Sequence, residues 1–384
     1  MKKRRVVILG STGSIGESAL KVARDIPERM EIVGLAAGKN VARLMEQARE
    51  FSPHAIAIGD EAAARSASRS QMPLHVGEDG LCELATMPEA DMVLISIVGT
   101  AGLRPALAAI EAGKDIAVAS KEILVMAGEA VMTAARKKGV QVLPVDSEHN
   151  AIFQCIEGRR PEQVRRIILT ASGGPFRTLP AADLQNVTRA QALKHPTWVM
   201  GAKITIDSAT LFNKGLEMIE ARWLFDVEMA RVDVIVHPQS IIHSMVEFVD
   251  NSVLAQLSAT DMCFPIQFAV TWPERVLNRL PPLDFSKLAK LEFEAPRTKD
   301  FPALELARWA GTDGGTLPSV MNAANEIAVA TFLDDRCSFP AIWRTVESVM
   351  RVHTNKPHAT LAEILDADAW ARVIAAEKIA QGAR

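Results

Sequence analysis

Arg5-Val-Val-Ile-Leu-Gly-Ser-Thr-Gly-Ser-Ile-Gly16, near the start of a 384-residue chain, joins an apolar run to a glycine-rich turn. The run Arg5–Leu9 predicts a buried strand, and Ser14–Asp25 predicts a helix directly after the turn. Glycines let a backbone approach an anion, and a helix N-terminus offers it free N–H groups. The segment therefore predicts a cradle for the pyrophosphate of a dinucleotide. A plain tight turn is the alternative, because the spacing is G-x-x-G-x-x-G. The residues expected to contact the cofactor in this cradle are Ser11, Thr12, Gly13, Ser14 and Ile15.

A second predicted strand, Glu31–Ala37, leads into Gly38, Lys39 and Asn40. A site that prefers NAD usually places an acid here for the ribose 2′-hydroxyl, and none occurs from Ile32 to Leu44. A cation and an amide suit a 2′-phosphate better, so this loop predicts NADP. In the alternative interpretation Lys39 is solvated and Asn40 caps the following helix, and both roles of Asn40 are compatible.

The composition is that of an ordinary globular chain, with 48% hydrophobic and 23% charged residues and a net charge of −3. This charge provides no field for nucleic acid or an anionic membrane, so neither is expected as a partner. The four cysteines lie far apart, which favours a reducing compartment and no cysteine metal site. No apolar stretch approaches a signal peptide or membrane helix, and we expect a cytoplasmic protein. Tyrosine is absent, so it cannot supply an acid or base.

Alternation of strand and helix organises the first part of the chain. Further predicted strands are Ala55–Ile58, Met92–Val98, Asp115–Ala119 and Gln141–Val145. This pattern is typical of a parallel sheet covered on both faces, with ligands at the carboxyl ends of its strands. We therefore expect an α/β fold whose first domain, over 1–150, is Rossmann-like and binds NADPH.

The pattern of predicted strands and helices changes beyond residue 150. Strand-like runs mix with helices and polar loops, which predicts an α+β connecting and catalytic domain over 151–285. Prolines from Pro281 to Pro302 predict a linker over 286–302. A C-terminal helical bundle over 303–384 is expected from four helical segments: Ala303–Ala310, Leu317–Leu333, Ala341–His353 and Leu361–Lys378.

Carboxylates form the first candidate catalytic group. If the strand over Gln141–Val145 continues, Asp146 and Glu148 point the same way, since side chains alternate along a strand. Glu217, expected in the first turn of a helix ending at Phe225, is a third candidate, with Glu220 as a surface charge. A divalent cation would remove the repulsion between such groups, and oxygen ligands favour Mg²⁺ or Mn²⁺. An acidic strand end in solvent is the alternative.

Two further groups fit a phosphorylated substrate. Hydroxyls, an amide and a cation suited to a phosphate occur at Ser172, Ser208, Asn213 and Lys214, although each alone is typical of caps and turns. The segment His195–Gly201 carries Trp198 and is interpreted as a lid that excludes water, with a packed surface turn as the alternative.

Longer motifs resemble one known family, 1-deoxy-D-xylulose 5-phosphate reductoisomerase, over nearly the whole chain. They are Leu9–Gly16, Ser120–Glu122, Val145–Asn150, Leu169–Arg177, His195–Trp198, Lys203–Glu217, His237–His243 and Met321–Glu326. The resemblance implies an NADPH- and Mg²⁺- or Mn²⁺-dependent enzyme, usually a homodimer. It rearranges a phosphorylated sugar, 1-deoxy-D-xylulose 5-phosphate, and reduces it with NADPH to 2-C-methyl-D-erythritol 4-phosphate in the non-mevalonate isoprenoid route.

The resemblance also implies residue roles. The metal ligands would be Asp146, Glu148 and Glu217, and the catalytic group would add Lys121, His149 and His195. The substrate would contact Lys121, Ser147, Glu148, Ser172, His195, Trp198, Ser208, Asn213, Lys214, Glu217 and His243. The cofactor would contact Ser120 and Glu122 in addition to the turn and the loop after the second strand.

Some positions depart from the family pattern. Ser120 stands where relatives commonly have Asn, Met218 replaces a common Tyr, and the segment 247–265, which is expected at a subunit interface, diverges most.

Two rival functions are a simple NADP-dependent dehydrogenase and a non-catalytic NADP sensor. The three carboxylates argue against the first, since hydride transfer alone needs no such metal site, and with the phosphate-binding set they argue against the second.

Overall fold

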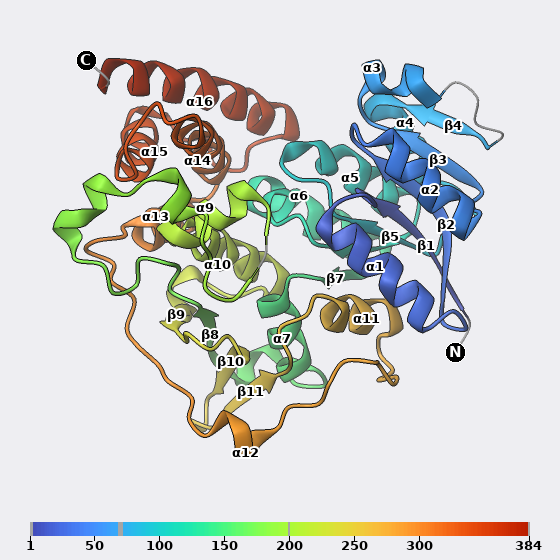
Figure 1. Cartoon of the computed structure of the whole chain (residues 1–384), viewed down its shortest axis with the longest axis horizontal. Helices are drawn as coiled ribbons and strands as arrows, with labels where there is room; N and C mark the ends of the chain where they lie inside the picture. The colour runs from blue at the N-terminus through green and yellow to red at the C-terminus, as the bar shows by residue number, and fades with distance from the viewer. Residues whose placement is uncertain (1–2, 68–71, 199, 383–384) are drawn as a thin grey trace. The chain divides into compact units, whose positions relative to one another are not determined.

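The structure is a computed structural model that describes residues 3–67, 72–198 and 200–382 (Figure 1). The chain divides into two compact units, each described here by itself. The first comprises Met1–Ile123, Glu129–Asn150 and Asp261–Pro282, and the second comprises Leu124–Gly128, Ala151–Thr260 and Leu283–Arg384. The four-part division expected from the sequence stays a prediction.

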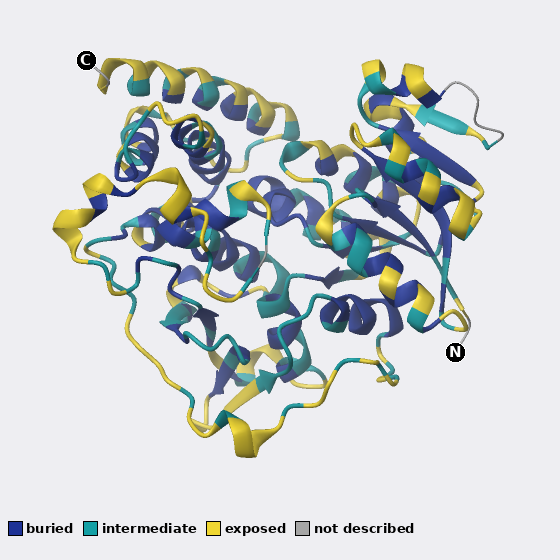
Figure 2. Ribbon diagram, viewed as in Figure 1, coloured by how far each residue is buried: buried dark blue, intermediate teal, exposed yellow. Residues whose placement is uncertain are grey.

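The first unit is built on a parallel sheet, as predicted. Its strands among the described residues are β1 (Arg4–Leu9), β2 (Met30–Ala37), β3 (Ala55–Ile58), β4 (Leu74–Val76), β5 (Met92–Ile95), β6 (Asp115–Val118) and β7 (Val142–Pro144). They lie in the order β4-β3-β2-β1-β5-β6-β7, so the strand order reverses at β1. Val6 to Leu9 in β1 are fully buried, and Figure 2 shows the same burial along the neighbouring strands. Ligands of such sheets bind where the order reverses, and here the glycine-rich turn follows β1.

Helices connect these strands. They are α1 (Ser14–Asp25), α2 (Val41–Phe51), α3 (Glu61–Ala64), α4 (Gly77–Ala85), α5 (Leu103–Glu111) and α6 (Glu122–Lys138). A further helix, α11 (Cys263–Thr271), joins this unit from far along the chain and packs against α1. Its residues from Pro265 to Thr271 are all buried, which explains why its composition is apolar all round.

The second unit contains a mixed sheet. Its strands are β8 (Val164–Ala171), β9 (Val232–Val236), β10 (Ile242–Phe248) and β11 (Val253–Leu257), in the order β11-β10-β8-β9. Within the described residues of this second sheet, only β8 and β9 pair in parallel, as expected of an α+β domain. The helix α7 (Ser147–Ile156) crosses the division between the units, because its first four residues cluster with the first unit.

Helices make up most of the rest of the second unit. They are α8 (Arg189–Ala192), α9 (Ala202–Thr210), α10 (Phe212–Phe225), α12 (Phe285–Leu288), α13 (Ala303–Asp313), α14 (Leu317–Leu333), α15 (Ala341–Val352) and α16 (Leu361–Gly382). The last four confirm the predicted C-terminal helices. The start of α16 has a capping box, in which Glu363 N donates to Thr360 Oγ1 at 3.3 Å and Thr360 N donates to Glu363 Oε2 at 3.0 Å. Aromatic edge contacts of Phe339 with Phe176, Phe332 and Trp343 tie α14 and α15 to the loop after β8.

Three boundaries predicted from the sequence were wrong. The strand predicted over Met92–Val98 ends at Ile95, and that over Gln141–Val145 ends at Pro144. Ser147 begins α7 rather than continuing a strand. Short elements such as β4 were missed because three residues are too few to show a period. Among the described residues no helix has the length and apolar character needed to cross a membrane.

Candidate active site

The turn after β1 has the geometry of an anion cradle. Gly10 has φ +93°, and a Cβ there would lie 2.7 Å from Ser96 O. A Cβ on Gly16 would lie 2.4 Å from Gly10 O, so only glycine lets α1 start this close to the turn. Gly13 is the N-cap of α1 and supplies no side-chain cap, which leaves the first N–H groups of the helix for a ligand.

Ser11 differs from its neighbours in this turn. It is fully buried, its N–H donates to Ala36 O at 2.8 Å, and its hydroxyl donates to Gln47 Oε1 at 2.7 Å. Its polar groups therefore shape the turn. Thr12, Gly13, Ser14 and Ile15 are partly or fully exposed and remain the predicted cofactor contacts.

The loop after β2 supports both interpretations of Asn40. Its side chain accepts a hydrogen bond from Arg43 N at 3.2 Å and so caps α2, while Gly38, Lys39 and Asn40 are all exposed. The structure also adds an acid that the sequence reading missed, because Asp60 follows β3, the strand paired with β2. Asp60 lies 3.7 Å from Lys39 Nζ, and its pKa is lowered by the hydrogen bond from Ala63 N and by the Lys39 charge.

The loop after β8, the predicted lid and α9 meet at a polar cluster of Ser172, His195 and Ser208. The Nε2 atom of His195 lies 3.1 Å from Ser172 Oγ and 3.0 Å from Ser208 Oγ. Gly174, with φ +67°, approaches α9 so closely that a Cβ would lie 2.9 Å from Ser208 O. Three of the residues expected to bind the substrate are therefore brought together by backbone packing that only glycine allows.

His195 also holds its own loop. Its Nδ1 accepts the N–H groups of Thr197 at 3.2 Å and Trp198 at 2.9 Å. Since Nδ1 is an acceptor, the ring proton sits on Nε2 and donates to the serine hydroxyls. Burial lowers the pKa of His195, which favours this neutral ring. Val199, within the predicted lid, lies outside the described residues.

The carboxylates come together differently from the prediction. Asp146 precedes α7 and Glu148 lies in its first turn, so the extended-strand argument that aligned them was wrong. Ser147 donates to Glu148 Oε2 at 2.6 Å, and Lys121, at the start of α6, donates to Asp146 Oδ2 at 2.5 Å. A strand end followed at once by a helix N-terminus places these acids where the helix dipole stabilises negative charge.

Glu217 lies in the second turn of α10, not the first, because the helix already begins at Phe212. Asn213 donates to its Oε1 at 2.6 Å and Lys214 to its Oε2 at 2.5 Å. Both the Glu217 carboxylate and the Lys214 ammonium are buried. Two residues expected at the substrate phosphate thus contact a predicted metal ligand, and their phosphate contact stays a prediction.

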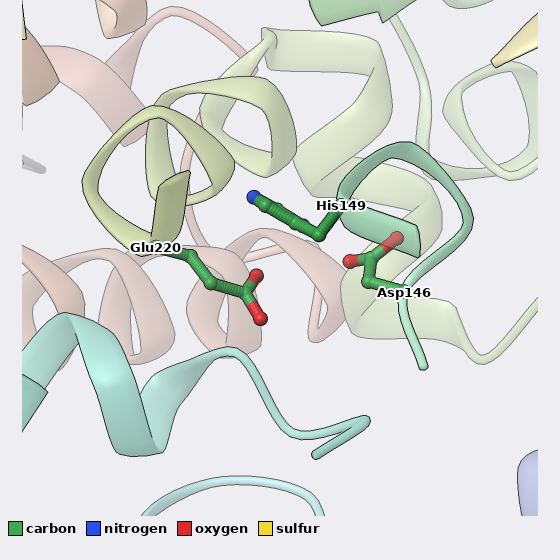
Figure 3. Close-up of side chains that lie close together, drawn as sticks. All are labelled: Asp146, His149 and Glu220. Atoms are coloured by element: carbon green, nitrogen blue, oxygen red, sulfur yellow. The ribbon is translucent and has the colours of Figure 1, made fainter. Parts of the chain in front are cut away.

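Among the residues that the structure describes, two sets of three could hold a metal ion. In each set, ligand atoms lie within 4.8 Å of one another: Asp146, Glu148 and Glu217 in one, and Asp146, His149 and Glu220 in the other. Figure 3 shows the second set, with the Asp146 and Glu220 carboxylates on either side of the space beside the His149 ring. Glu220 is fully buried, so its interpretation as a surface charge was wrong. Its spacing of three residues from Glu217 on one helix was the signal that could have found it.

The remaining predicted residues occupy defined places. Ser120 donates its hydroxyl to Ile97 O, Glu122 is buried at the start of α6, and Thr170 Oγ1 donates to the backbone carbonyl of the buried His243 at 2.7 Å. Their contacts with cofactor or substrate, like that of Trp198, stay predictions.

Three family models match this chain. Those described as 1-deoxy-D-xylulose 5-phosphate reductoisomerase, its C-terminal domain, and the DXP reductoisomerase C-terminal domain match residues 6–128, 142–225 and 257–374 respectively. The chain belongs to this family. A 1-deoxy-D-xylulose 5-phosphate reductoisomerase of Symbiobacterium thermophilum is 53% identical over 98% of this chain and 99% of its own length. The one of Chlorobaculum tepidum is 54% identical over 97% of this chain and 98% of its own length.

Solved structures of reductoisomerases have the same fold. The enzyme of Zymomonas mobilis in complex with NADPH is 44% identical, with a TM-score of 0.91 over 98% of this chain and 99% of that one. A second structure, in complex with NADPH, fosmidomycin and magnesium, is 39% identical, with a TM-score of 0.91 over 98% of both chains. The predicted α/β class with a Rossmann-like parallel sheet, a second sheet and C-terminal helices is thereby confirmed.

Proposed function

We propose that this chain converts 1-deoxy-D-xylulose 5-phosphate to 2-C-methyl-D-erythritol 4-phosphate, using NADPH and a divalent cation, in the non-mevalonate isoprenoid pathway. The observation that carries the proposal is the set Asp146, Glu148 and Glu217, whose oxygens lie within 4.8 Å of one another in a chain of the reductoisomerase family. Hydride transfer alone needs no such set of carboxylates, so the function of a simple dehydrogenase would not explain why these three side chains lie together.

The donor set fits a hard cation. All three side chains offer carboxylate oxygens, which suit Mg²⁺ or Mn²⁺, and a cation offsets the repulsion among them. When bound, the cation would act as a Lewis acid on the oxygens of the substrate. Lys121 and Lys214 already hydrogen-bond Asp146 and Glu217, so these ammonium groups stabilise the carboxylates before a cation arrives.

The polar cluster at Ser172, His195 and Ser208 would bind the phosphate of the substrate. Two hydroxyls and the His195 Nε2–H can each donate to a phosphate oxygen. Asn213 and Lys214 begin α10 just after α9, and would add an amide and a cation. A substrate held by its phosphate in this way keeps its carbon skeleton in one orientation, which lowers the entropic part of the barrier.

Cofactor selection is assigned to the loop after β2. We expect NADPH to be preferred over NADH by at least about 10-fold, because Lys39 and Asn40 can meet a 2′-phosphate. Lys39→Asp should shrink that ratio by repelling the phosphate, and the ratio of kcat/KM values for the two cofactors measures it. Asp60→Asn is the matched control, because it keeps the side-chain oxygen that caps α3 and removes a negative charge beside Lys39. It should raise the ratio. Equal use of both cofactors by the unmodified enzyme would refute the assignment.

The segment His195–Gly201 is expected to order over bound substrate. Trp198 fluorescence should change when a phosphorylated substrate analogue binds, and a Trp198→Phe variant identifies its share of the signal. The change should weaken when the pH falls through the lowered pKa of His195, because a protonated His195 no longer accepts the N–H groups of Thr197 and Trp198. The direction follows from the pKa of His195, which burial lowers, so the neutral ring and its contacts are present at higher pH. Hydrogen exchange in this loop that is equally slow with and without the analogue would identify it as a packed surface turn.

We also propose that the chain is a cytoplasmic homodimer and that Mn²⁺ can replace Mg²⁺. Exposed Val253 and Leu254 on the edge strand β11 support an interface there, since an open apolar strand edge is otherwise prone to unspecific pairing. Sedimentation of the purified protein tests the oligomeric state.

A direct assay tests the proposed function. NADPH oxidation, followed by its absorbance, should require both 1-deoxy-D-xylulose 5-phosphate and Mg²⁺ or Mn²⁺. It should stop on addition of a chelator and return with excess metal. Turnover that persists without a divalent cation would favour the dehydrogenase, and the absence of any turnover with both present would favour a sensor.

A further inference from the structure

A buried carboxylate lies directly beside the proposed phosphate-binding cluster. Asp207 in α9 is 1% exposed and immediately precedes Ser208, whose hydroxyl contacts His195. One of its oxygens, Oδ2, lies 2.6 Å from Lys203 Nζ, one turn earlier in the same helix. The other, Oδ1, accepts a hydrogen bond from Asn325 Nδ2 at 2.8 Å. The second contact joins α9 to α14, which is 118 residues away in the sequence.

The chemistry of this pair fixes its orientation. An ionised carboxylate only accepts hydrogen bonds, so the amide nitrogen of Asn325 must face Asp207. Asn325 is itself fully buried, and its Oδ1 has no hydrogen-bond partner within the described part of the chain. Burying an amide oxygen in this way is unfavourable, whereas a leucine or methionine would pack in α14 without that cost. The presence of an asparagine at position 325 is therefore explained by the N–H group that it donates to Asp207.

Asp207 and Ser208 are consecutive residues of α9, so the contacts that hold Asp207 also hold the backbone next to Ser208. Ser208 follows it by one residue near the end of α9, and Leu211 in the left-handed conformation, with φ +66°, ends that helix. The backbone of α9 at Ser208 is also in close contact with Gly174, in the turn that carries Ser172. A rotation or shift of α9 would therefore change the spacing of the two serine hydroxyls that meet at His195.

We propose that Asn325, through Asp207, is a positioning residue that sets α9 so that Ser208, His195 and Ser172 together fit a phosphate group. The helix α14 thus contributes to substrate affinity without touching the substrate. This inference rests on the proposed function only in taking phosphate as the ligand of the cluster.

Asn322 offers a matched control. It lies one turn before Asn325 in α14, it is also fully buried, and its Oδ1 likewise has no partner among the residues described. Its Nδ2, however, donates to Glu326 at 3.0 Å within the same helix, and not to α9. Alanine at either position removes a buried amide of the same size from the same helix, so the comparison separates loss of stability from loss of positioning.

The test compares Asn325→Ala with Asn322→Ala in the full-length protein. Asn325→Ala should raise the KM for 1-deoxy-D-xylulose 5-phosphate and the inhibition constant of inorganic phosphate by about 10-fold each, as expected when a hydrogen bond to a buried charge is lost. The KM for NADPH should change by less than about 2-fold, since the cofactor turn belongs to the other unit. Asn322→Ala should lower the melting temperature as much and leave all three constants within about 2-fold.

Exchanging the two side chains, Asn325 and Asp207, provides a second test. It should restore phosphate affinity, which a purely structural role of Asn325 does not predict. Asn325→Asp places two carboxylates face to face and should weaken phosphate binding more than alanine does. Adding Asp207→Asn restores one donor and one acceptor and should recover most of the affinity. Equal effects of Asn325→Ala and Asn322→Ala on inorganic phosphate binding, or no rescue by the exchange, would overturn the proposal. Phosphate affinity can be measured by calorimetry without turnover, so a wild-type protein that binds phosphate but does not convert the sugar would refute the proposed function alone.

Discussion

Glu217→Gln should lower turnover by at least about 100-fold at any Mg²⁺ concentration that supports the unmodified enzyme. Loss of support around a metal already costs about 10- to 100-fold, and this substitution removes the charge of a ligand itself. Gln keeps the shape of the side chain and can still contact Asn213. It removes the negative charge shared with Asp146 and Glu148 and leaves the Lys214 ammonium buried without its carboxylate.

The measurement is kcat as a function of Mg²⁺ concentration, together with the dissociation constant of NADPH, which should change little because the glycine-rich turn belongs to the other unit. Asp368→Asn is the control, because it neutralises another buried carboxylate, paired with Arg372, away from the candidate ligands. It should lower stability and leave the response to Mg²⁺ unchanged. Asp146→Asn and Glu148→Gln should behave like Glu217→Gln, and near-normal turnover in any of the three would remove that residue from the site.

Gly16→Ala should destabilise the first unit by about 3 kcal/mol and abolish NADPH binding at concentrations that saturate the unmodified enzyme. A Cβ at this position would lie 2.4 Å from Gly10 O and from Ser11 Cα. Overpacking costs about 1 to 3 kcal/mol, and a collision with backbone atoms belongs at the upper end because no side chain can rotate away. The start of α1 must therefore move off the turn, and its N–H groups no longer converge on the pyrophosphate.

The loss of stability is measured by denaturant unfolding, monitored by circular dichroism. The loss of cofactor binding is measured by titration with NADPH, monitored by its fluorescence. Gly59→Ala provides the comparison in the same unit, because its Cβ would make ordinary contacts, the nearest at 3.5 Å to Leu81. Its midpoint should stay close to that of the unmodified protein. If Gly16→Ala binds NADPH as tightly as Gly59→Ala, close packing of α1 on the turn is not what forms the cofactor site.

Local signals in the sequence predicted much of this architecture. The helices Ser14–Asp25 and Leu317–Leu333 have the predicted bounds, since amphipathic or apolar periodicity and clear end signals define them within the segment itself. The parallel sheet followed from regular alternation of strand and helix. The family-specific roles came from the long motifs and not from spacing alone.

Contacts between distant segments were not readable in the same way. Asp60 follows a different strand from Lys39, and α11 joins the first unit from beyond residue 260. Asp146 and Glu148 were paired for the wrong reason, because a strand end and a helix start cannot be distinguished over three residues. Tertiary packing decides each of these cases, and no local pattern encodes it.

The proton NMR spectrum of the product made from 1-deoxy-D-xylulose 5-phosphate, NADPH and Mg²⁺ tests the proposed rearrangement. Mass does not separate the candidates, because rearrangement with reduction and simple reduction give isomers. We expect a methyl singlet, since in 2-C-methyl-D-erythritol 4-phosphate the methyl group is bonded to a carbon that bears no hydrogen. The three-carboxylate set is the feature of this chain that calls for that rearrangement. A methyl doublet, from a methyl group beside a CH–OH carbon in an unrearranged chain, would contradict it.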